Sequence, residues 1–435
     1  MTSGNLREEA GIGAAVVTAP PVALRGVLAW ALGATFFMFA FLQRVSPSVM
    51  VDELMRDFSV SAIILGNLSA CYFYTYAAMQ IPIGLMVERL GPRIMLTGFA
   101  LVCVGGNMIF ALADSVTGAY LGRILIGAGA GAGWVGTLTL ATRWLPARRF
   151  ALLTGLGQVF GMAGAVFGQY PLSLAVETFG WRQSLMALAA LIGLMSVLFW
   201  LVVRDFPPGA APASRENPQP AAPMLKMIGE VVRRPQSWLA AAVGLAYTGP
   251  MLGFAGLWAV PFLVSAHGYS RSEAAGLASL LFIGWAVAAP LIGWFADRTG
   301  WFRPILVAGG VISALSLSGV LYLPPLWGPW QMTVLVIVAG AAGATMILTF
   351  SCARAANRPE ASAAVYGFVN MAVTASGGLL QPLVGWLLDL QWDGRMEAGV
   401  PVYETGHYLN ALSVFPLIAF LGAIAALFLR GAPRP

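Results

Sequence analysis

The residues best suited to chemistry in this sequence are a few ionisable side chains inside long apolar stretches. Arg44 is the clearest case, since it lies in the segment Phe39–Ser48, which reads FAFLQRVSPS. A guanidinium in such surroundings is costly unless it is paired, hydrated or functional. Its planar fork can bind a carboxylate or a phosphate through two parallel hydrogen bonds. We predict that Arg44 binds an anion; the alternative is that it extends to a polar boundary or makes a structural hydrogen bond.

Two further groups of side chains could line the same site. Arg123 also lies within an apolar stretch, where it could contact a solute or couple two helices. Tyr72 and Tyr76 are four residues apart and therefore share a helix face. They could offer hydroxyl groups or serve only in packing. Tyr247 is a candidate because Gly249-Pro250 follows it, a place where a helix can break and expose backbone groups.

Three amides complete the candidate site. Gln43 directly precedes Arg44, and Gln158 and Asn370 lie at corresponding positions 212 residues apart. The last two could form a polar clamp around a solute, or join helices through hydrogen bonds. The two interpretations are equally open.

Residues for other kinds of chemistry are missing. Cys71, Cys103 and Cys352 have no metal-ligand spacing and are expected to be small buried side chains. The two histidines are far apart, and no HExxH motif or phosphate-binding glycine loop occurs. We therefore expect no metal, no cofactor and no ATP-driven pumping. No pair of nucleophile and base lies within the apolar stretches, so we do not expect an enzyme.

The composition indicates that membrane-crossing helices position these residues. Of 435 residues, 59% are hydrophobic and only 10% are charged, with a mean hydropathy of +0.79. Soluble domains carry about 25% charged residues. A membrane-crossing helix needs about 20 apolar residues, and twelve stretches of this kind follow one another along the chain. They cover residues 27–50, 59–83, 94–113, 117–141, 151–175, 183–203, 237–265, 273–295, 304–323, 330–352, 363–388 and 407–429.

The stretches fall into two sets of six. We predict an N-terminal tail (1–26), an N-terminal six-helix bundle (27–204), a proline-rich linker (205–235), a C-terminal six-helix bundle (236–430) and a short C-terminal tail (431–435). The linker is expected to hold one interfacial helix near residues 224–232.

The basic residues are distributed among the segments between the apolar stretches and do not form one cluster. With the N-terminal tail inside, the inner segments hold 18 of the 24 basic residues and the outer loops hold four. This bias predicts that both termini are cytoplasmic, and it explains the net charge of +6 without nucleic acid. The 23 arginines against one lysine hint at a GC-rich genome, and we expect a bacterial inner membrane.

The two halves repeat one another. Gly84, Glu88, Arg89, Gly91 and Arg93 follow the second stretch, and Gly293, Asp297, Arg298, Gly300 and Arg303 follow the eighth. The fifth and eleventh stretches also match at a constant offset of 212, through Gly155, Gln158, Gln169 and Glu177 against Gly367, Asn370, Gln381 and Asp389. Glycines allow tight packing and sharp turns, and the acid can pair with a base or a helix N-terminus. We expect the two loops to act as a conformational latch.

These loops resemble the signature loop of the major facilitator superfamily, whose members have two six-helix halves related as parallel repeats. The glycine-rich run Gly122–Gly133 and Gly180-Trp181-Arg182 add to a likeness that covers about residues 27–430. The stretch from Arg44 through Gly66, and then Tyr72 to Arg93, is similar to the organic anion:cation symporters and organophosphate:phosphate antiporters. In those branches an arginine at the position of Arg44 contacts the substrate anion, so the resemblance implies the same here.

The sequence also departs from the pattern. Glu88 stands where aspartate is usual, and Pro92 occupies a place that is often basic. Ile126 and Gly161-Met162 replace the glutamine and the Gly-Pro pair of many proton-driven drug exporters of the family, which argues against drug export. Proton-driven relatives often carry a carboxylate next to the first-span arginine, but here that residue is Gln43.

Together these features predict an all-α membrane protein of twelve helices, in the major facilitator fold, that moves a small organic anion of carboxylate or phosphate type by alternating access. The loops around Glu88 and Asp297 would latch the outward-facing state. A facilitator or exporter of a neutral or hydrophobic solute is the alternative. A receptor and an integral-membrane enzyme are less favoured. We expect a monomer whose partners are the substrate, the bilayer and a coupling proton or counter-anion; the solute, the direction and the driving ion stay open.

Overall fold

The structure is a computed structural model that describes residues 24–146, 149–207, 221–323, 329–358, 361–397 and 399–430. In this part of the chain, twelve helical segments are long and apolar enough to cross a membrane. They confirm the twelve predicted stretches, and no predicted boundary differs by more than five residues. The largest difference is at the third segment, predicted from 94 and found from Arg89. Most of the predicted N-terminal tail, much of the linker and the C-terminal tail lie outside the described residues.

The first half of the chain supplies six membrane segments from eight α-helices and one 3-10 turn. Its elements are α1 (Leu24–Val45), η1 (Ser46–Val49), α2 (Val51–Phe58), α3 (Ala62–Ala111), α4 (Val116–Ala130), α5 (Ala132–Trp144), α6 (Phe150–Phe167), α7 (Tyr170–Phe179) and α8 (Trp181–Val202). Helix α3 contains both the second and the third segment, which meet at a break.

The second half is built in the same way after the linker helix. Its elements are α9 (Ala221–Val232), α10 (Pro235–Gly249), η3 (Pro250–Trp258), α11 (Ala259–His267), α12 (Arg271–Thr299), α13 (Phe302–Tyr322), α14 (Pro329–Gly343), η4 (Ala344–Met346), α15 (Ile347–Ala355), α16 (Ser362–Gln391), β1 (Met396–Glu397), β2 (Val400–Pro401), α17 (Thr405–Leu412) and α18 (Val414–Leu427). The antiparallel pair β1–β2 is a small hairpin between α16 and α17.

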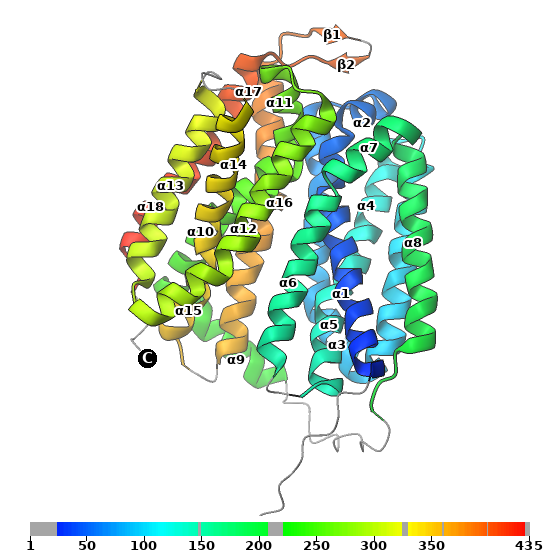
Figure 1. Ribbon diagram of the computed structural model, residues 1–435, viewed down its shortest axis with the longest axis vertical. Coiled ribbons are helices and arrows are strands. Elements are labelled where there is room, and N and C mark those ends of the chain that lie inside the picture. Colours follow the sequence, from blue (N-terminus) through cyan, green and yellow to red (C-terminus); the bar gives the residue numbers. More distant parts are fainter. Residues whose placement is uncertain are drawn as a thin grey trace, which may run out of the picture.

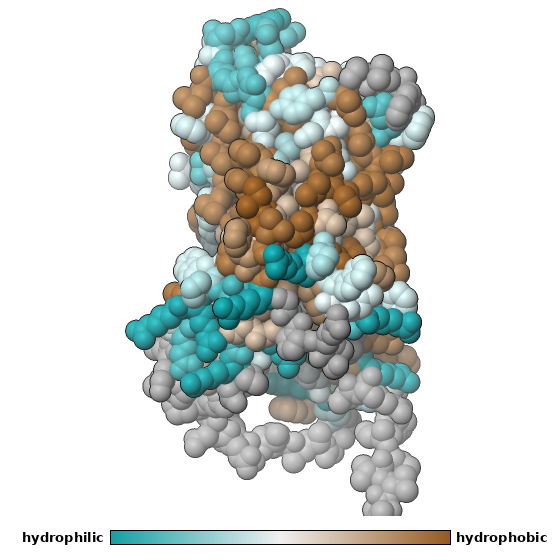
Figure 2. Space-filling view, turned by 90° about the vertical axis from the view of Figure 1, so that its left-hand side faces the viewer, coloured by the Kyte–Doolittle hydropathy of each residue, from teal (hydrophilic) through white to brown (hydrophobic). Residues whose placement is uncertain are grey.

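The two halves stand side by side with their helices roughly parallel (Figure 1). We call the end with β1, β2, α2, α7 and α17 the hairpin end, and the opposite end, where α1 begins and α9 lies, the terminal end. The face drawn in Figure 2 carries a broad apolar band between polar rims, as expected for a surface that contacts lipid. The chain is therefore an integral, multi-pass membrane protein.

Two irregularities in the helices, a kink and a change of helix type, follow from the local sequence. Gly91 has φ +78°, which L-residues with side chains rarely adopt, and it separates the two segments of α3. After Gly249 the chain stays helical, with right-handed helical torsions at Gly249 and Pro250, but it changes to η3, a nine-residue π-helical segment that begins at Pro250. A π-helix leaves backbone groups without their usual α-helical partners and often marks a functional region.

Candidate functional site

Arg44 is the last arginine of α1, in the final turn before the 3-10 segment η1, which begins at Ser46 and has Pro47 as its second residue. The residue is only 6% exposed. Its guanidinium carbon lies 4.2 Å from the ring centroid of Phe41 and 4.9 Å from that of Tyr76. The ring centroids of Tyr72 and Phe73 lie at 5.5 and 5.8 Å. Arg44 is thus enclosed by four aromatic rings, each within cation–π range.

The Nε atom of Arg44 is buried and has no hydrogen-bond partner. Arg44 takes part in none of the five ion pairs found among the described residues. Buried polar groups are nearly always paired in native proteins, so an unpaired donor on a buried cation calls for an explanation. An acceptor that arrives from outside the chain would provide one.

The aromatic rings connect Arg44 to both halves. Tyr72 and Tyr76 stack with centroids 5.8 Å apart and an interplanar angle of 16°, which places both on one face of α3. The Tyr72 hydroxyl donates to the carbonyl of Ala40 at 2.8 Å. The Phe73 ring abuts Gly377 of α16, in the second half. Arg44 therefore lies one side chain away from the boundary between the halves.

Gln43 and Arg123 belong to a buried polar network beside this site. The Arg123 Nη1 donates to the carbonyl of Gln43 at 2.8 Å, and its Nη2 donates to the carbonyl of Ser69 at 3.2 Å. The Gln43 Oε1 accepts from Asn107 Nδ2 at 2.7 Å. Arg123 is fully buried and joins α4 to α1 and α3. Its described contacts are those of a helix coupler.

The other three candidates are not joined to Arg44 by any described hydrogen bond or ring contact. Tyr247 is fully buried and donates to the carbonyl of Leu306 at 2.7 Å, so it faces α13 within the second half. Gln158 on α6 and Asn370 on α16 are exposed side chains. The sequence analysis predicts that Tyr247, Gln158 and Asn370 belong to the same site as Arg44, and this stays a prediction.

A second set of contacts seals the hairpin end across the two halves. The carboxylate of Asp389 on α16 accepts from the backbone N–H of Ala62 at 3.1 Å and of Ile63 at 2.9 Å. These two N–H groups lie at the N-terminus of α3, where the helix dipole favours a negative charge. The Tyr403 hydroxyl donates to Asp389 at 2.5 Å. Burial, and then its hydrogen bond to Asp389, raise the pKa of Tyr403, so the hydroxyl keeps its proton.

Two glutamines hold the π-helical segment η3 from both sides. Gln169 Nε2 donates to the carbonyl of Ala255 at 2.7 Å, and Gln381 Nε2 donates to that of Leu252 at 2.8 Å. Both side chains are fully buried. They are the repeat-related pair at the offset of 212. The sequence identifies Gln169, Gln381 and Asp389 as repeat positions, but it does not predict them as site residues. The signal that could have identified them is a polar residue at the same position in both halves.

Further cross-half contacts lie at the same end. Arg271 on α12 pairs with Glu53 on α2 at 2.5 Å. The backbones of α3 and α16 touch, because a Cβ on Gly66 would lie 2.7 Å from the Gln381 carbonyl oxygen, and one on Gly385 would overlap Ala62. The contact deepest along α3 is the Tyr74 hydroxyl, which donates to the carbonyl of Gly378 at 2.6 Å. This set of cross-half contacts, from Glu53 to Tyr74, is here called the hairpin-end seal.

The predicted latch loops lie at the other end, and their described contacts stay within their own halves. The Arg93 backbone N–H donates to Asp205 Oδ1 at 3.1 Å, and the Arg93 guanidinium lies 4.0 Å from the Trp200 ring centroid. Arg298 stacks on Trp294 at 4.4 Å, and Gly300 ends α12 with φ +70°. In the described chain, no hydrogen bond or ion pair joins Arg89, Arg93, Asp297 or Arg303 to the opposite half. The Glu88 side chain lies outside the described residues.

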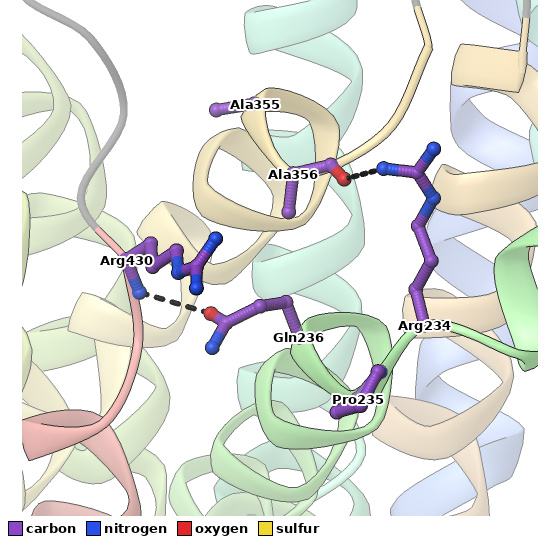
Figure 3. Close-up of a pocket in the computed structure, with 6 residues that line it drawn as sticks. All are labelled: Arg234, Pro235, Gln236, Ala355, Ala356 and Arg430. Carbon is purple, nitrogen blue, oxygen red and sulfur yellow. Dashed lines mark hydrogen bonds between the residues drawn. The ribbon is translucent and has the colours of Figure 1, made fainter.

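A separate pocket of about 500 Å³ opens at the terminal end of the second half (Figure 3). Its lining consists of Arg234, Pro235, Gln236, Ala355, Ala356 and Arg430. Arg234 Nη1 donates to the Ala356 carbonyl at 2.5 Å, and the Arg430 backbone N–H donates to Gln236 Oε1 at 2.9 Å. None of the six residues belongs to the first half, so this pocket does not lie between the two halves.

Comparison with known proteins decides the family. The Major Facilitator Superfamily matches residues 31–382. The chain belongs to the major facilitator superfamily. Its members are transporters of this fold and not enzymes. A crystal structure of a bacterial homologue of the human lysosomal transporter Spinster, inward-facing and unoccupied, aligns with a TM-score of 0.75 at 18% identity, over 95% of this chain and 100% of that one.

Curated members of the superfamily resemble the chain at low identity. The probable sulfoacetate transporter SauU of Cupriavidus necator is 23% identical over 67% of this chain and 70% of its own length. The gentisate transporter of Corynebacterium glutamicum is 24% identical over 91% of this chain and 88% of its own length. Both names specify an organic anion.

Proposed function

We propose that this member of the major facilitator superfamily is a secondary transporter of a small organic anion, with Arg44 as the residue that binds the anion. The observation that carries the proposal is the buried Arg44 guanidinium, whose Nε lacks a partner. A carboxylate oxygen would satisfy that donor with a charge-assisted hydrogen bond, which is stronger than a neutral one. The names of the two relatives support the same class of substrate.

The proposed mechanism is alternating access. The cross-half hydrogen bonds and ion pair described above all belong to the hairpin-end seal, which supports a conformation closed at that end. With cytoplasmic termini, as the arginine bias predicts, this is the inward-facing state in a bacterial inner membrane. The loops around Arg93 and Asp297, without a described bond between halves, would then engage only when the opposite end closes.

The driving ion is restricted by the chemistry beside Arg44. The neighbouring residue is Gln43, whose amide cannot take up a proton near neutral pH and whose Oε1 is already bonded to Asn107. Proton coupling through this residue is therefore not proposed. Exchange of one anion for another, facilitated diffusion, and proton symport through the substrate carboxyl or a peripheral acid are the remaining schemes. Uptake into proteoliposomes with an imposed pH gradient, or with internal counter-anion, separates the three.

Uptake of radiolabelled carboxylates and phosphates into proteoliposomes tests the function. We expect Arg44→Gln to abolish uptake that the native protein supports. Arg395→Gln is the matched control, because its ion pair with Glu404 at 3.7 Å is exposed and worth little. Uptake that continues unchanged in Arg44→Gln would remove Arg44 from the binding site.

The aromatic surroundings of Arg44 give one reason to keep a second function, which is transport of a neutral or hydrophobic solute. Phe41 and Phe73 present apolar surface, and an arginine satisfied by ring faces alone would need no anion. Competition experiments distinguish the two functions. Inhibition of uptake by benzoate but not by benzamide supports the anion, whereas equal inhibition by both supports the neutral solute.

A further inference from the structure

The number of available positive charges near Arg44 sets a limit on the substrate. Within the described residues, the buried charged side chains are Arg44 and Arg123. Arg123 already donates to the carbonyls of Gln43 and Ser69. Moving Arg123 to a substrate would break two buried hydrogen bonds from a charged group, which is unfavourable. The Nε of Arg123 is also buried without a partner, but both of its Nη groups are bonded to backbone carbonyls, so Arg44 is the charge that can reach a ligand without breaking these bonds.

Two polar side chains beside Arg44, Gln43 and Tyr72, are already hydrogen-bonded. The Gln43 amide donates to the carbonyl of Phe39 at 3.2 Å and accepts from Asn107. The Tyr72 hydroxyl donates to the carbonyl of Ala40. A second negative charge on a ligand would meet these groups without a free cation, and a buried unpaired charge is costly.

The other side chains around the Arg44 guanidinium are flat aromatic rings. Phe41 and Tyr76, each 6% exposed, present ring surface beside Arg44, and the fully buried Tyr72 stacks on Tyr76 with the two ring planes 16° apart. Ring faces carry partial negative charge and repel anions, but they pack well against another neutral ring. The body of a ligand held at Arg44 by its carboxylate would lie beside these rings.

We infer that the Arg44 site selects monoanions in which one carboxylate is joined to a planar, ring-containing body, over dicarboxylates, sulfonate-carboxylate dianions and phosphate esters. The inference rests on the proposed function and narrows its substrate class. The relatives do not decide the matter, since gentisate bears one carboxylate whereas sulfoacetate bears two acidic groups.

Calorimetric titration of the purified full-length protein in lipid nanodiscs tests this selectivity. The probes are benzoate, isophthalate, which adds a second carboxylate to the same ring, and phenyl phosphate. We expect benzoate to bind at least ~10-fold more tightly than either dianion, and we expect Arg44→Gln to remove its binding. Butyrate and succinate give the same comparison without a ring.

Variants of Tyr76 test the ring wall. We expect Tyr76→Leu to weaken benzoate binding by about 10-fold, whereas Tyr76→Phe, which keeps the ring and loses the hydroxyl, changes it by less than about 3-fold. Thermal unfolding of each variant reports whether it is folded. Equal losses in both variants, or none in Tyr76→Leu, would overturn the role of the ring.

The outcomes separate this inference from the function on which it rests. Isophthalate or phenyl phosphate that binds as tightly as benzoate, and only when Arg44 is present, would overturn the selection of monoanions and leave anion transport standing. Anion binding that is absent from the native protein, or indifferent to Arg44→Gln, would contradict the proposed function itself.

Discussion

Asp389→Asn is the change that most directly probes the hairpin-end seal. The carboxylate of Asp389 accepts two backbone N–H groups at the start of α3, which belongs to the opposite half. Asparagine keeps the shape of the side chain but offers one acceptor oxygen in place of two and carries no charge. The closed hairpin end should lose stability relative to the open one, because both bonds must break when the halves separate at this end.

The size of the effect follows from the bonds that are lost. A hydrogen bond to a charged group contributes about 1.5–3 kcal/mol, and the helix N-terminus adds up to about 1 kcal/mol for a charge. Taking about 2 kcal/mol for the substitution, the ratio of open to closed molecules should rise about 30-fold. A starting ratio of about 1:99 would then become roughly 30:99, so about a quarter of the molecules would be open.

Spin-label distance measurement reports these populations. Phe179→Cys on α7 and Leu323→Cys after α13 place labels on exposed positions of opposite halves at the hairpin end, in a background with the native cysteines replaced. We expect a longer-distance population to grow in Asp389→Asn. Asp393→Asn, an exposed aspartate whose described contact stays within the hairpin, is the control. An unchanged distance distribution in Asp389→Asn would refute the view that this carboxylate holds the seal.

Three other substitutions give distinct outcomes. Tyr403→Phe removes the hydroxyl that donates to Asp389 and accepts from the Ala62 backbone N–H at 3.1 Å, but it keeps the Asp389 carboxylate on both N–H groups, so it should produce a smaller growth of the long-distance population than Asp389→Asn; an equal or larger growth would contradict this order. Gly385→Ala forces a Cβ into the Ala62 carbonyl and should also favour the open hairpin end, seen as faster alkylation of a cysteine introduced in the seal; unaltered alkylation would argue that the backbones are not in contact. Arg123→Leu removes two buried hydrogen bonds from a charged group and should lower the unfolding free energy by about 2–5 kcal/mol in denaturant titrations, and an unchanged midpoint would show that the coupling is dispensable.

The membrane segments were predictable because their signal is local. Long apolar stretches separated by basic loops leave few alternatives when every backbone group in lipid must be bonded within a helix. The shared face of Tyr72 and Tyr76 followed from a spacing of four residues and is observed. At the Gly249-Pro250 pair, where a break was predicted, the helix continues but changes to the π-helical segment η3.

Contacts between the halves were not predictable in the same way. Asp389 and Ala62 are 327 residues apart, and no periodicity connects them. Their meeting depends on how two complete bundles dock in one conformation. The direction of Tyr247 was also beyond reach, because a buried tyrosine in α10 can turn towards α13 or towards the other half with the same hydropathy pattern. Which side an amide or hydroxyl faces is decided by packing.

The most direct test of the central claim is to locate a bound anion by determining the structure with 4-bromobenzoate, whose bromine marks its position. Our account predicts a carboxylate oxygen at about 2.7–2.9 Å from the Arg44 guanidinium, the usual distance for a charge-assisted bond, with the ring beside Tyr76. A molecule bound elsewhere, for example in the pocket between Arg234 and Arg430, with Arg44 left without a ligand, would contradict the claim that Arg44 binds the substrate.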